Sequence, residues 1–167
     1  MYENVTFRYP VSEDGPAMRE IARESQVLSV NSGYFYALMA RHFKATCLVA
    51  ALPGRICGYV AGYSPPGRSD TLFIWQIGVA QADRGKGLGK KLLTSLVVKK
   101  RPVFLEATID PNNQASINLF SSVARHFAAN HHFARVPFFT AKDLGAGEPA
   151  EHLMTIGPFA SCLKNLF

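Results

Sequence analysis

The segment Arg84-Gly85-Lys86-Gly87-Leu88-Gly89 decides the fold, because it joins an apolar run to an amphipathic one. Residues 71–79, ahead of it, are apolar almost throughout, which is typical of a central strand covered on both faces. After it, apolar residues recur at helical spacing from Leu88 to Val97. The sequence therefore predicts a strand, a glycine-rich turn and a helix in direct succession.

The composition of this turn favours a phosphate-binding site. Glycine lets the backbone approach a ligand closely, and the first turn of a helix offers unpaired N–H groups and partial positive charge. Arg84 and Lys86 add countercharge for a pyrophosphate. The spacing fits neither the Rossmann fingerprint nor the Walker pattern. A plain helix-capping turn is the alternative, and it does not account for the basic residues at the same place.

Strand and helix patterns alternate along the rest of the chain. Strand patterns cover residues 5–9, 46–52, 56–63, 103–109 and about 152–159. Helical patterns cover residues 12–27 and 33–42, and another follows the polar loop 110–113. Pro53-Gly54 predicts a hairpin, and beyond Val136 the pattern is weak. This order predicts an α/β fold with a mixed sheet.

Length and charge point to one globular domain with an anionic small-molecule partner. The chain has 167 residues, of which 48% are hydrophobic, so we expect a single domain over residues 1–167. The formal net charge is +6, and the densest basic cluster lies on the glycine-rich turn. That position favours phosphate groups of a small molecule over nucleic acid, with a solvated helix face as the alternative.

Cysteine usage and hydropathy indicate a cytoplasmic protein. Cys47, Cys57 and Cys162 are odd in number and widely spaced, which suits neither a disulfide framework nor a zinc site. We expect buried free thiols in a reducing compartment. Residues 1–4 carry no secretory signature and no apolar run reaches membrane-spanning length, so we expect no membrane partner.

Two motifs in sequence resemble those of the GCN5-related N-acetyltransferase superfamily. Ile77-Gly78-Val79, four residues, and then the turn from Arg84 to Gly89 match the family signature at its central strand. The second motif is matched by Asn113, Ser116, Leu119 and Phe120. The resemblance implies a mixed, mostly antiparallel sheet of six to seven strands flanked by about four helices. It also implies acetyl-CoA as co-substrate and no metal ion.

Longer blocks resemble the L-2,4-diaminobutyrate acetyltransferases within this superfamily. The blocks include residues 30–34, 58–63, 71–77, 105–109 and 156–159, and Trp75-Gln76 is the most distinctive pair. Enzymes of that family acetylate the γ-amine of diaminobutyrate in the biosynthesis of ectoine, a compatible solute that serves in osmoprotection. The resemblance therefore implies this reaction on a small-molecule amine, and it implies a homodimer.

The resemblance also assigns the CoA site. A backbone amide on the central strand usually stabilises the oxyanion in this superfamily, and we place it in Ile77-Gly78-Val79. The same backbone is expected to pair with the pantetheine arm as a strand would. The expected cofactor-binding set is Ile77, Gly78, Val79, Arg84, Gly85, Lys86, Gly87, Leu88, Gly89 and Asn113.

Glu106 is the residue expected to act as general base or ammonium anchor. An alkylammonium has a pKa of about 10.4 and must lose a proton before its nitrogen can attack. Glu106 is the only acid within residues 103–109, where Leu105 and Ala107 flank it. A solvent-facing strand residue is the alternative, and the family resemblance favours the functional role.

Contacts to the acceptor are expected from polar and aromatic residues on several elements. Asn31, Ser32 and Thr108 can hydrogen-bond its charged groups, and Trp75 can wall the site. Asn31 and Ser32 can equally cap the helix beginning near residue 33, and Trp75 can be plain core. The expected acceptor-binding set is Asn31, Ser32, Tyr34, Trp75, Gln76 and Thr108.

Several positions depart from the family pattern. Ser29 stands where the family has an aspartate, Asp110 opens a loop that usually begins with threonine, and Met154-Thr155 replaces Tyr-Arg. Phe120 replaces the tyrosine that many relatives use to protonate the leaving thiolate, so another group serves or the thiolate leaves unassisted. An acetyltransferase for another small amine and a binding module that has lost catalysis are therefore the alternatives.

Overall fold

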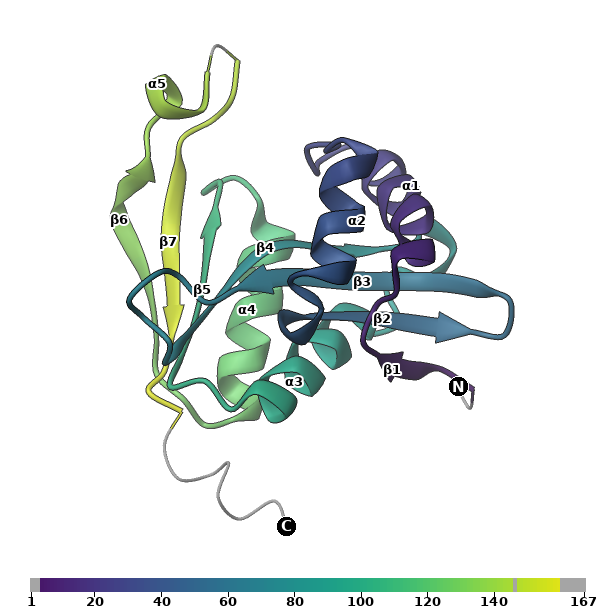
Figure 1. Cartoon of the computed structure of the whole chain (residues 1–167). Helices are drawn as coiled ribbons and strands as arrows, with labels where there is room; N and C mark the ends of the chain where they lie inside the picture. The colour runs from purple at the N-terminus through teal and green to yellow at the C-terminus, as the bar shows by residue number, and fades with distance from the viewer. Residues whose placement is uncertain (1–3, 146, 160–167) are drawn as a thin grey trace. The chain divides into compact units, whose positions relative to one another are not determined.

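The computed structural model describes residues 4–145 and 147–159, which fall into two compact units. Unit 1 contains the described residues of Met1–Tyr63 and Trp75–Lys100, and unit 2 contains those of Ser64–Ile74 and Arg101–Phe167. The strand β4 (Thr71–Val79) runs from unit 2 into unit 1 (Figure 1). That residues 1–167 form one domain stays a prediction.

Unit 1 contains an antiparallel meander. The strand β1 (Thr6–Arg8) pairs with β2 (Cys47–Leu52), and β2 pairs with β3 (Arg55–Tyr63). The predicted hairpin at Pro53-Gly54 is confirmed, and Gly54 takes the positive φ of 79° that this turn requires. All three strands were therefore predicted to within one or two residues.

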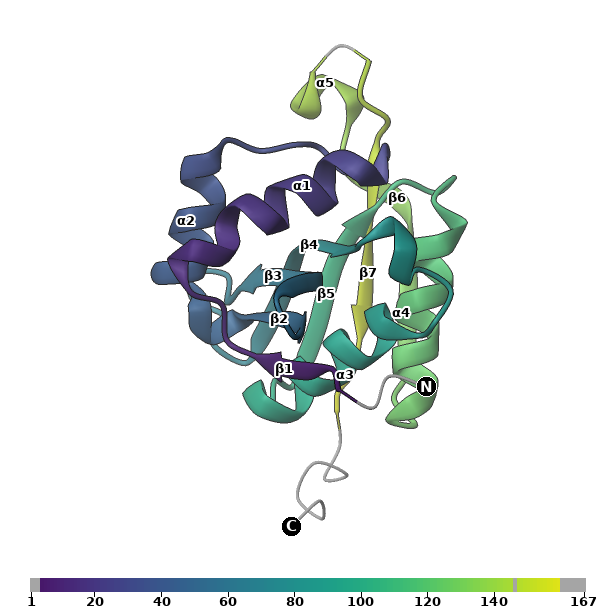
Figure 2. The same cartoon turned by 90° about the vertical axis from the view of Figure 1, so that its right-hand side faces the viewer.

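Three helices accompany these strands in unit 1, each next to a short 3₁₀ segment. Their bounds are α1 (Gly15–Ser25), α2 (Gly33–Arg41) and α3 (Leu88–Lys100), with η1 (Ser12–Asp14), η2 (Lys44–Thr46) and η3 (Gln81–Asp83). The helices α1 and α2 lie side by side (Figures 1 and 2).

Helices of unit 1 pack against both faces of β3. A Cβ built on Gly58 would lie 3.2 Å from Leu92 of α3. The next residue, Tyr59, packs edge to face against Tyr36 of α2. Because side chains alternate along a strand, α3 and α2 lie on opposite faces. The core on the α1–α2 face contains Met18, Ile21, Ala22, Tyr36, Met39, Cys47, Val49, Tyr59 and Ala61.

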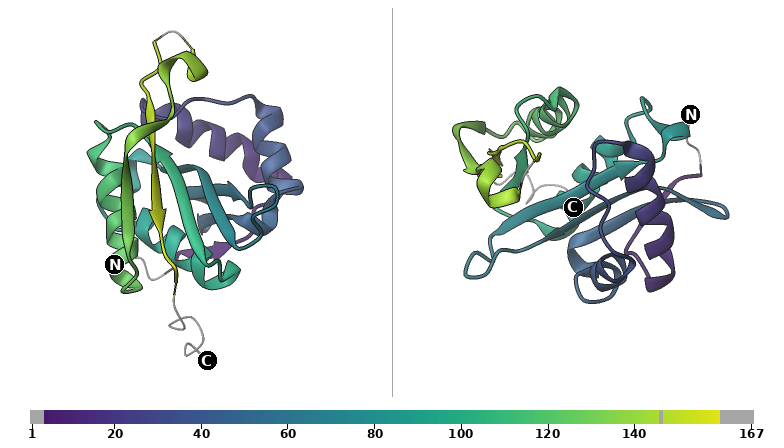
Figure 3. Two further views of the ribbon diagram at one scale, coloured as in Figure 1. Left: turned by 90° about the vertical axis from the view of Figure 1, so that its left-hand side faces the viewer. Right: turned by 90° about the horizontal axis from the view of Figure 1, so that it is seen from above.

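Unit 2 contains the first half of β4 and three further strands. The strand β4 runs parallel to β5 (Phe104–Ile109), with Thr71–Phe73 in register with Phe104–Glu106. The strand β7 (Glu151–Ile156) is antiparallel to both β5 and β6 (His131–Phe139), and α5 (Ala141–Leu144) follows β6 (Figure 3). The helix α4 (Gln114–His126) packs against β7.

The strand order among the described residues is β1-β2-β3-β4-β5-β7-β6, a mixed, mostly antiparallel sheet, as predicted. The strand β6 was missed, because most of its residues are exposed on both faces and its register shifts around Pro137. The buried free thiols of Cys47 and Cys57 are confirmed, and Cys162 lies outside the described residues. Among the described helices, none is both long and apolar enough to cross a membrane.

Candidate active site

The glycine-rich turn of unit 1 leads directly into a helix N-terminus. Gly85 and Gly87 have φ values of 74° and 77°, which other residues rarely adopt. No atom outside the neighbouring residues lies within 4 Å of a Cβ built on either glycine, so the turn is open. The helix α3 begins at Leu88, and its first N–H groups have no intrahelical acceptor. This geometry can hold a pyrophosphate through backbone donors.

The two basic side chains of the turn bond to protein oxygens. Arg84 donates to the carbonyls of Val79 and Glu24, at 3.1 and 3.3 Å. Lys86 donates to the carbonyl of Ala82 at 2.8 Å. Both side chains therefore help to hold the turn in place. Their role as countercharge for a phosphate stays a prediction.

Asp83 anchors this turn, and the sequence reasoning missed it. Asp83 is only 2% exposed, and its carboxylate accepts hydrogen bonds from Arg55 at 2.5 and 3.2 Å. Lys86 lies 3.4 Å from the same carboxylate. The sequence does place an acidic residue immediately before the basic turn. Its partner Arg55, however, is 28 residues away, so the pairing leaves no local pattern.

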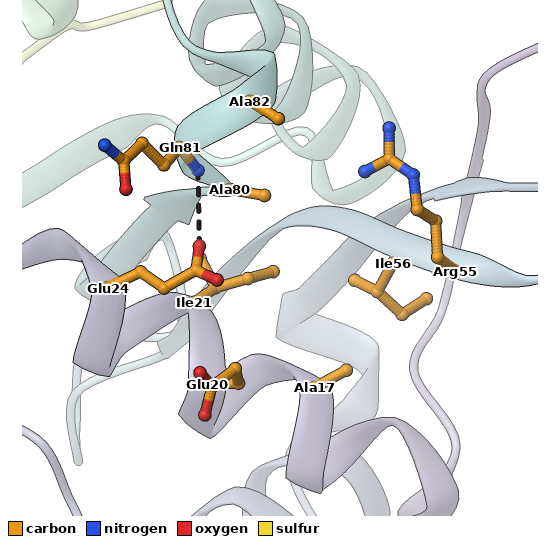
Figure 4. A pocket seen from close by; sticks show the side chains of 9 residues that line it. All are labelled: Ala17, Glu20, Ile21, Glu24, Arg55, Ile56, Ala80, Gln81 and Ala82. Atoms are coloured by element: carbon orange, nitrogen blue, oxygen red, sulfur yellow. Dashed lines mark hydrogen bonds between the residues drawn. The ribbon is translucent and has the colours of Figure 1, made fainter.

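A hollow of about 550 Å³ lies beside the start of the turn (Figure 4). Glu20 and Glu24 of α1 line one side, and Arg55 lines another. Glu24 accepts a hydrogen bond from the backbone N–H of Gln81 at 3.3 Å, as the dashed line marks (Figure 4). The carboxylates of Glu20 and Glu24 disfavour a phosphate in this hollow, so the anion site is not expected to extend into it.

The second half of β4 packs closely against α1 and the segment after it. A Cβ on Gly78 would lie 2.9 Å from Ile21, 3.0 Å from Tyr59 and 3.3 Å from Leu28, so a larger residue here would force these side chains to shift. Trp75 is 53% exposed and contacts the ring of Phe35, so the plain-core alternative is wrong.

The expected acceptor residues of unit 1 cluster around the start of α2. Ser32 caps this helix by accepting a hydrogen bond from Phe35 N–H at 3.2 Å, as the capping alternative predicted. The backbone N–H of Asn31 lies 3.4 Å from the hydroxyl of Tyr36. Tyr34 is 77% exposed. Gln76 is buried and bonds to Tyr36, Tyr59 and the carbonyl of Ser29.

Glu106 of unit 2 is buried and paired with an arginine. It is 6% exposed, so the solvent-facing alternative is wrong. Arg68, in the loop before β4, donates to both carboxylate oxygens, at 3.2 and 2.5 Å. The sequence reasoning missed Arg68, because nothing local relates it to a strand 38 residues away.

Arg68 and Glu106 line a second hollow, of about 560 Å³. Asp70 also lines it, and Thr155 lies directly opposite Glu106 in the pairing of β5 with β7. The remaining lining residues are Gly67, Ser69, Thr71 and Phe104. Carboxylates and a guanidinium together can bind a molecule that carries both ammonium and carboxylate groups.

The other expected residues of unit 2 have partners of their own. The hydroxyl of Thr108 donates to Glu151 of β7. Asn113 caps α4 by accepting a hydrogen bond from Ser116 N–H at 3.1 Å. Neither of these two hydrogen bonds involves Glu106, and the functional roles assigned to Thr108 and Asn113 stay predictions.

Comparisons with known proteins agree with this fold. The model of the acetyltransferase (GNAT) family matches residues 15–124. The L-2,4-diaminobutyric acid acetyltransferase of Shouchella clausii is 38% identical over 94% of this chain and 89% of that protein. The enzyme of the same name from Bordetella parapertussis is 40% identical over 91% of this chain and 83% of that protein.

Solved structures show the same likeness. Diaminobutyrate acetyltransferase EctA from Paenibacillus lautus, in complex with L-2,4-diaminobutyric acid and coenzyme A, has a TM-score of 0.86 and 32% identity. The match covers 93% of this chain and 96% of that one. The putative acetyltransferase yncA from Salmonella typhimurium, solved with acetyl-CoA, has a TM-score of 0.73 and 22% identity over 93% and 95% of the two chains, which supports the fold alone.

The chain therefore belongs to the acetyltransferase (GNAT) family, and within it to the L-2,4-diaminobutyric acid acetyltransferases.

Proposed function

We propose that this chain transfers the acetyl group of acetyl-CoA to the γ-amine of L-2,4-diaminobutyrate, giving the Nγ-acetyl product on the route to ectoine. One observation carries the proposal: the chain matches, over 93% of its length, a structure that holds both diaminobutyrate and coenzyme A. Such a product serves osmoprotection through the compatible solute made from it.

The glycine-rich turn is the proposed binding site for the diphosphate of acetyl-CoA. Its open backbone at Gly85 and Gly87 and the free N–H groups at the start of α3 support this assignment. A backbone N–H within Ile77–Val79 is proposed to stabilise the oxyanion of the tetrahedral intermediate. Acetyl-CoA supplies the activated acyl group, and the chain contributes binding and orientation.

The proposed reaction is a direct transfer from thioester to amine. Glu106 accepts a proton from the γ-ammonium group, the nitrogen attacks the thioester carbon, and a C–N bond forms. The intermediate then collapses: the C–S bond breaks, the sulfur leaves as a thiolate, and the second proton on the nitrogen passes to solvent, which leaves a neutral amide. Phe120, which replaces the usual tyrosine, is buried and has no proton to donate. The thiolate therefore leaves without help from that position, which is feasible for a thiol of pKa about 8.5.

The hollow beside Glu106 is proposed to bind the acceptor through residues of unit 2. Diaminobutyrate carries two ammonium groups and one carboxylate, and the hollow offers Glu106, Asp70 and Arg68. The family pattern has an arginine where this chain has Thr155, directly opposite Glu106. We infer that Arg68 supplies the guanidinium from the loop before β4, releasing Glu106 as the substrate carboxylate takes its place.

A cytoplasmic homodimer is the proposed state of the enzyme. Buried free thiols at Cys47 and Cys57 suit a reducing compartment. The segment of β6 and α5 exposes apolar side chains that a second copy can cover, among them Val136, Phe138 and Leu144. Light scattering behind a sizing column tests the homodimer, since a mass near 18.3 kDa contradicts it.

A thiol-release assay with acetyl-CoA and a panel of amines tests the function. The panel contains 2,4-diaminobutyrate, ornithine, lysine and a polyamine. We expect turnover of diaminobutyrate at least about tenfold above the others in kcat/KM, since small differences in substrate length are worth that much. Preference for another amine supports the second candidate, which the absence of an acid at Ser29 favours. Coenzyme A binding without any turnover indicates a binding module.

A further inference from the structure

A buried polar cluster links β4 to the helix α2 in unit 1. The hydroxyls of Tyr36 and Tyr59 both donate to Oε1 of Gln76, and all three residues are at most 5% exposed. Burial raises the pKa of Tyr59, so its hydroxyl stays protonated and remains a donor. Polar groups are costly to bury unless they are hydrogen-bonded, and no buried side-chain polar atom among the described residues lacks a partner.

The cluster reaches the α1–α2 loop, residues 26–32, at two backbone atoms. Nε2 of Gln76 donates to the carbonyl of Ser29 at 2.8 Å. The N–H of Asn31 donates to the hydroxyl of Tyr36 at 3.4 Å. Leu28 packs against the core, whereas the side chains of Val27 and Val30 are exposed. Beyond Leu28, hydrogen bonds to the cluster therefore help to hold the loop.

Only an amide side chain satisfies all of these groups at position 76. Its oxygen accepts from two tyrosines while its nitrogen donates to Ser29. A carboxylate of the same shape accepts both hydroxyls but offers no donor for Ser29. An apolar side chain leaves both tyrosine hydroxyls without the acceptor for their protons, and it leaves the carbonyl of Ser29 without this donor.

We propose that Gln76 is a positioning residue, which fixes the α1–α2 loop so that Asn31 and Ser32 meet the acceptor in one arrangement. The proposal rests on the proposed function, because the expected role of Asn31 and Ser32 is contact with the acceptor amine. Gln76 acts through the loop, since its own amide is engaged with protein groups. Acetyl-CoA, held by the glycine-rich turn, is unaffected.

The two tyrosines provide a matched pair of variants. Tyr36→Phe and Tyr59→Phe each remove one hydroxyl from Gln76, at equally buried positions. Only Tyr36→Phe also removes the acceptor of Asn31 N–H. We expect Tyr36→Phe to raise the acceptor KM about fivefold above that of Tyr59→Phe, the equivalent of one hydrogen bond. The KM for acetyl-CoA changes less than twofold in both. Equal acceptor KM values in the two variants overturn the proposal.

Hydrogen exchange measures the loop without any substrate. In Gln76→Glu we expect the amide of Asn31, which is hydrogen-bonded to Tyr36, to exchange at least about tenfold faster than in the wild type, while the amides of α3 keep their rates. Unchanged exchange at Asn31 overturns the proposal even if diaminobutyrate is turned over. Conversely, faster exchange together with no turnover of diaminobutyrate by the wild type counts against the proposed function alone. The KM comparison then uses whichever amine the wild type accepts.

Discussion

Arg68 holds both carboxylate oxygens of Glu106, with Nη1 3.2 Å from Oε1 and Nη2 2.5 Å from Oε2. The carboxylate is almost buried, whereas the arginine side chain is half exposed. The pair therefore keeps a charge stable inside unit 2 while leaving the guanidinium accessible from the hollow. In the proposed mechanism, Arg68 gives up part of this contact when Glu106 accepts the proton of the substrate ammonium group.

Replacing Glu106 with glutamine tests its proposed role in proton transfer. Glu106→Gln keeps the shape and loses the proton acceptor, so we expect kcat to fall at least about 100-fold. Titration calorimetry is expected to give a coenzyme A affinity within about twofold of the wild type. The matched control is Asp143→Asn. The carboxylate of Asp143 is hydrogen-bonded to Thr140 at the start of α5, and its replacement is expected to leave kcat unchanged. Comparable losses of kcat and coenzyme A affinity in Glu106→Gln mean a structural role.

Removing Arg68 separates stability from acceptor binding. In Arg68→Ala the carboxylate of Glu106 stays buried without its guanidinium, and we expect a loss of about 1–2 kcal/mol in unfolding free energy, tempered by the exposure of Arg68. The acceptor KM is expected to rise about tenfold, since one charge-assisted contact is lost. The double variant with Glu106→Gln recovers the stability, because no uncompensated charge remains. If Arg68→Ala leaves both quantities unchanged, the ion pair has neither role.

The turn glycines can be tested against a glycine of the same conformation elsewhere. Gly87 and Gly54 have φ values of 77° and 79°, and a Cβ on either meets nothing within 4 Å. Each change to alanine is expected to cost about 1 kcal/mol of stability through the backbone. Only Gly87→Ala is expected to weaken coenzyme A binding, by about tenfold or more. Equal affinities in Gly87→Ala and Gly54→Ala contradict a diphosphate site at the turn.

Ionisation of the Cys47 thiol is expected to lower the free energy of unfolding at alkaline pH. Burial raises the pKa of its thiol from 9.0 to about 11. The folded state therefore disfavours the thiolate, so this contribution is complete below pH 9 and is lost as the pH rises toward about 11. Urea unfolding at pH 8 and pH 10.5 is expected to show a smaller decline for Cys47→Ala than for the wild type. Identical declines contradict a buried, protonated thiol.

The sequence predicted best the features whose signals are local. The strand β4, the glycine-rich turn and α3 follow one another within thirty residues, and each has its own pattern of polarity and glycine. The position of Ser32 before α2 is likewise a local capping signal, and the structure confirms the cap.

Features that depend on distant partners were not predictable. The burial of Glu106 depends on Arg68, and the hold on the glycine-rich turn depends on the pairing of Asp83 with Arg55. The strand β6 has no alternating pattern, since only its pairing with β7 defines it. The exposure of Trp75 could not be inferred either, because an aromatic residue on a central strand has the same sequence pattern in a core.

The most direct measurement for the proposed activity identifies which nitrogen carries the acetyl group. The protein is incubated with acetyl-CoA and 2,4-diaminobutyrate, and the product is examined by two-dimensional NMR. The predicted result is one product whose acetamide couples to the γ-methylene protons, with one thiol released per acetyl group. Acetylation at the α-nitrogen, or no product from diaminobutyrate while another amine is acetylated, contradicts the proposed function.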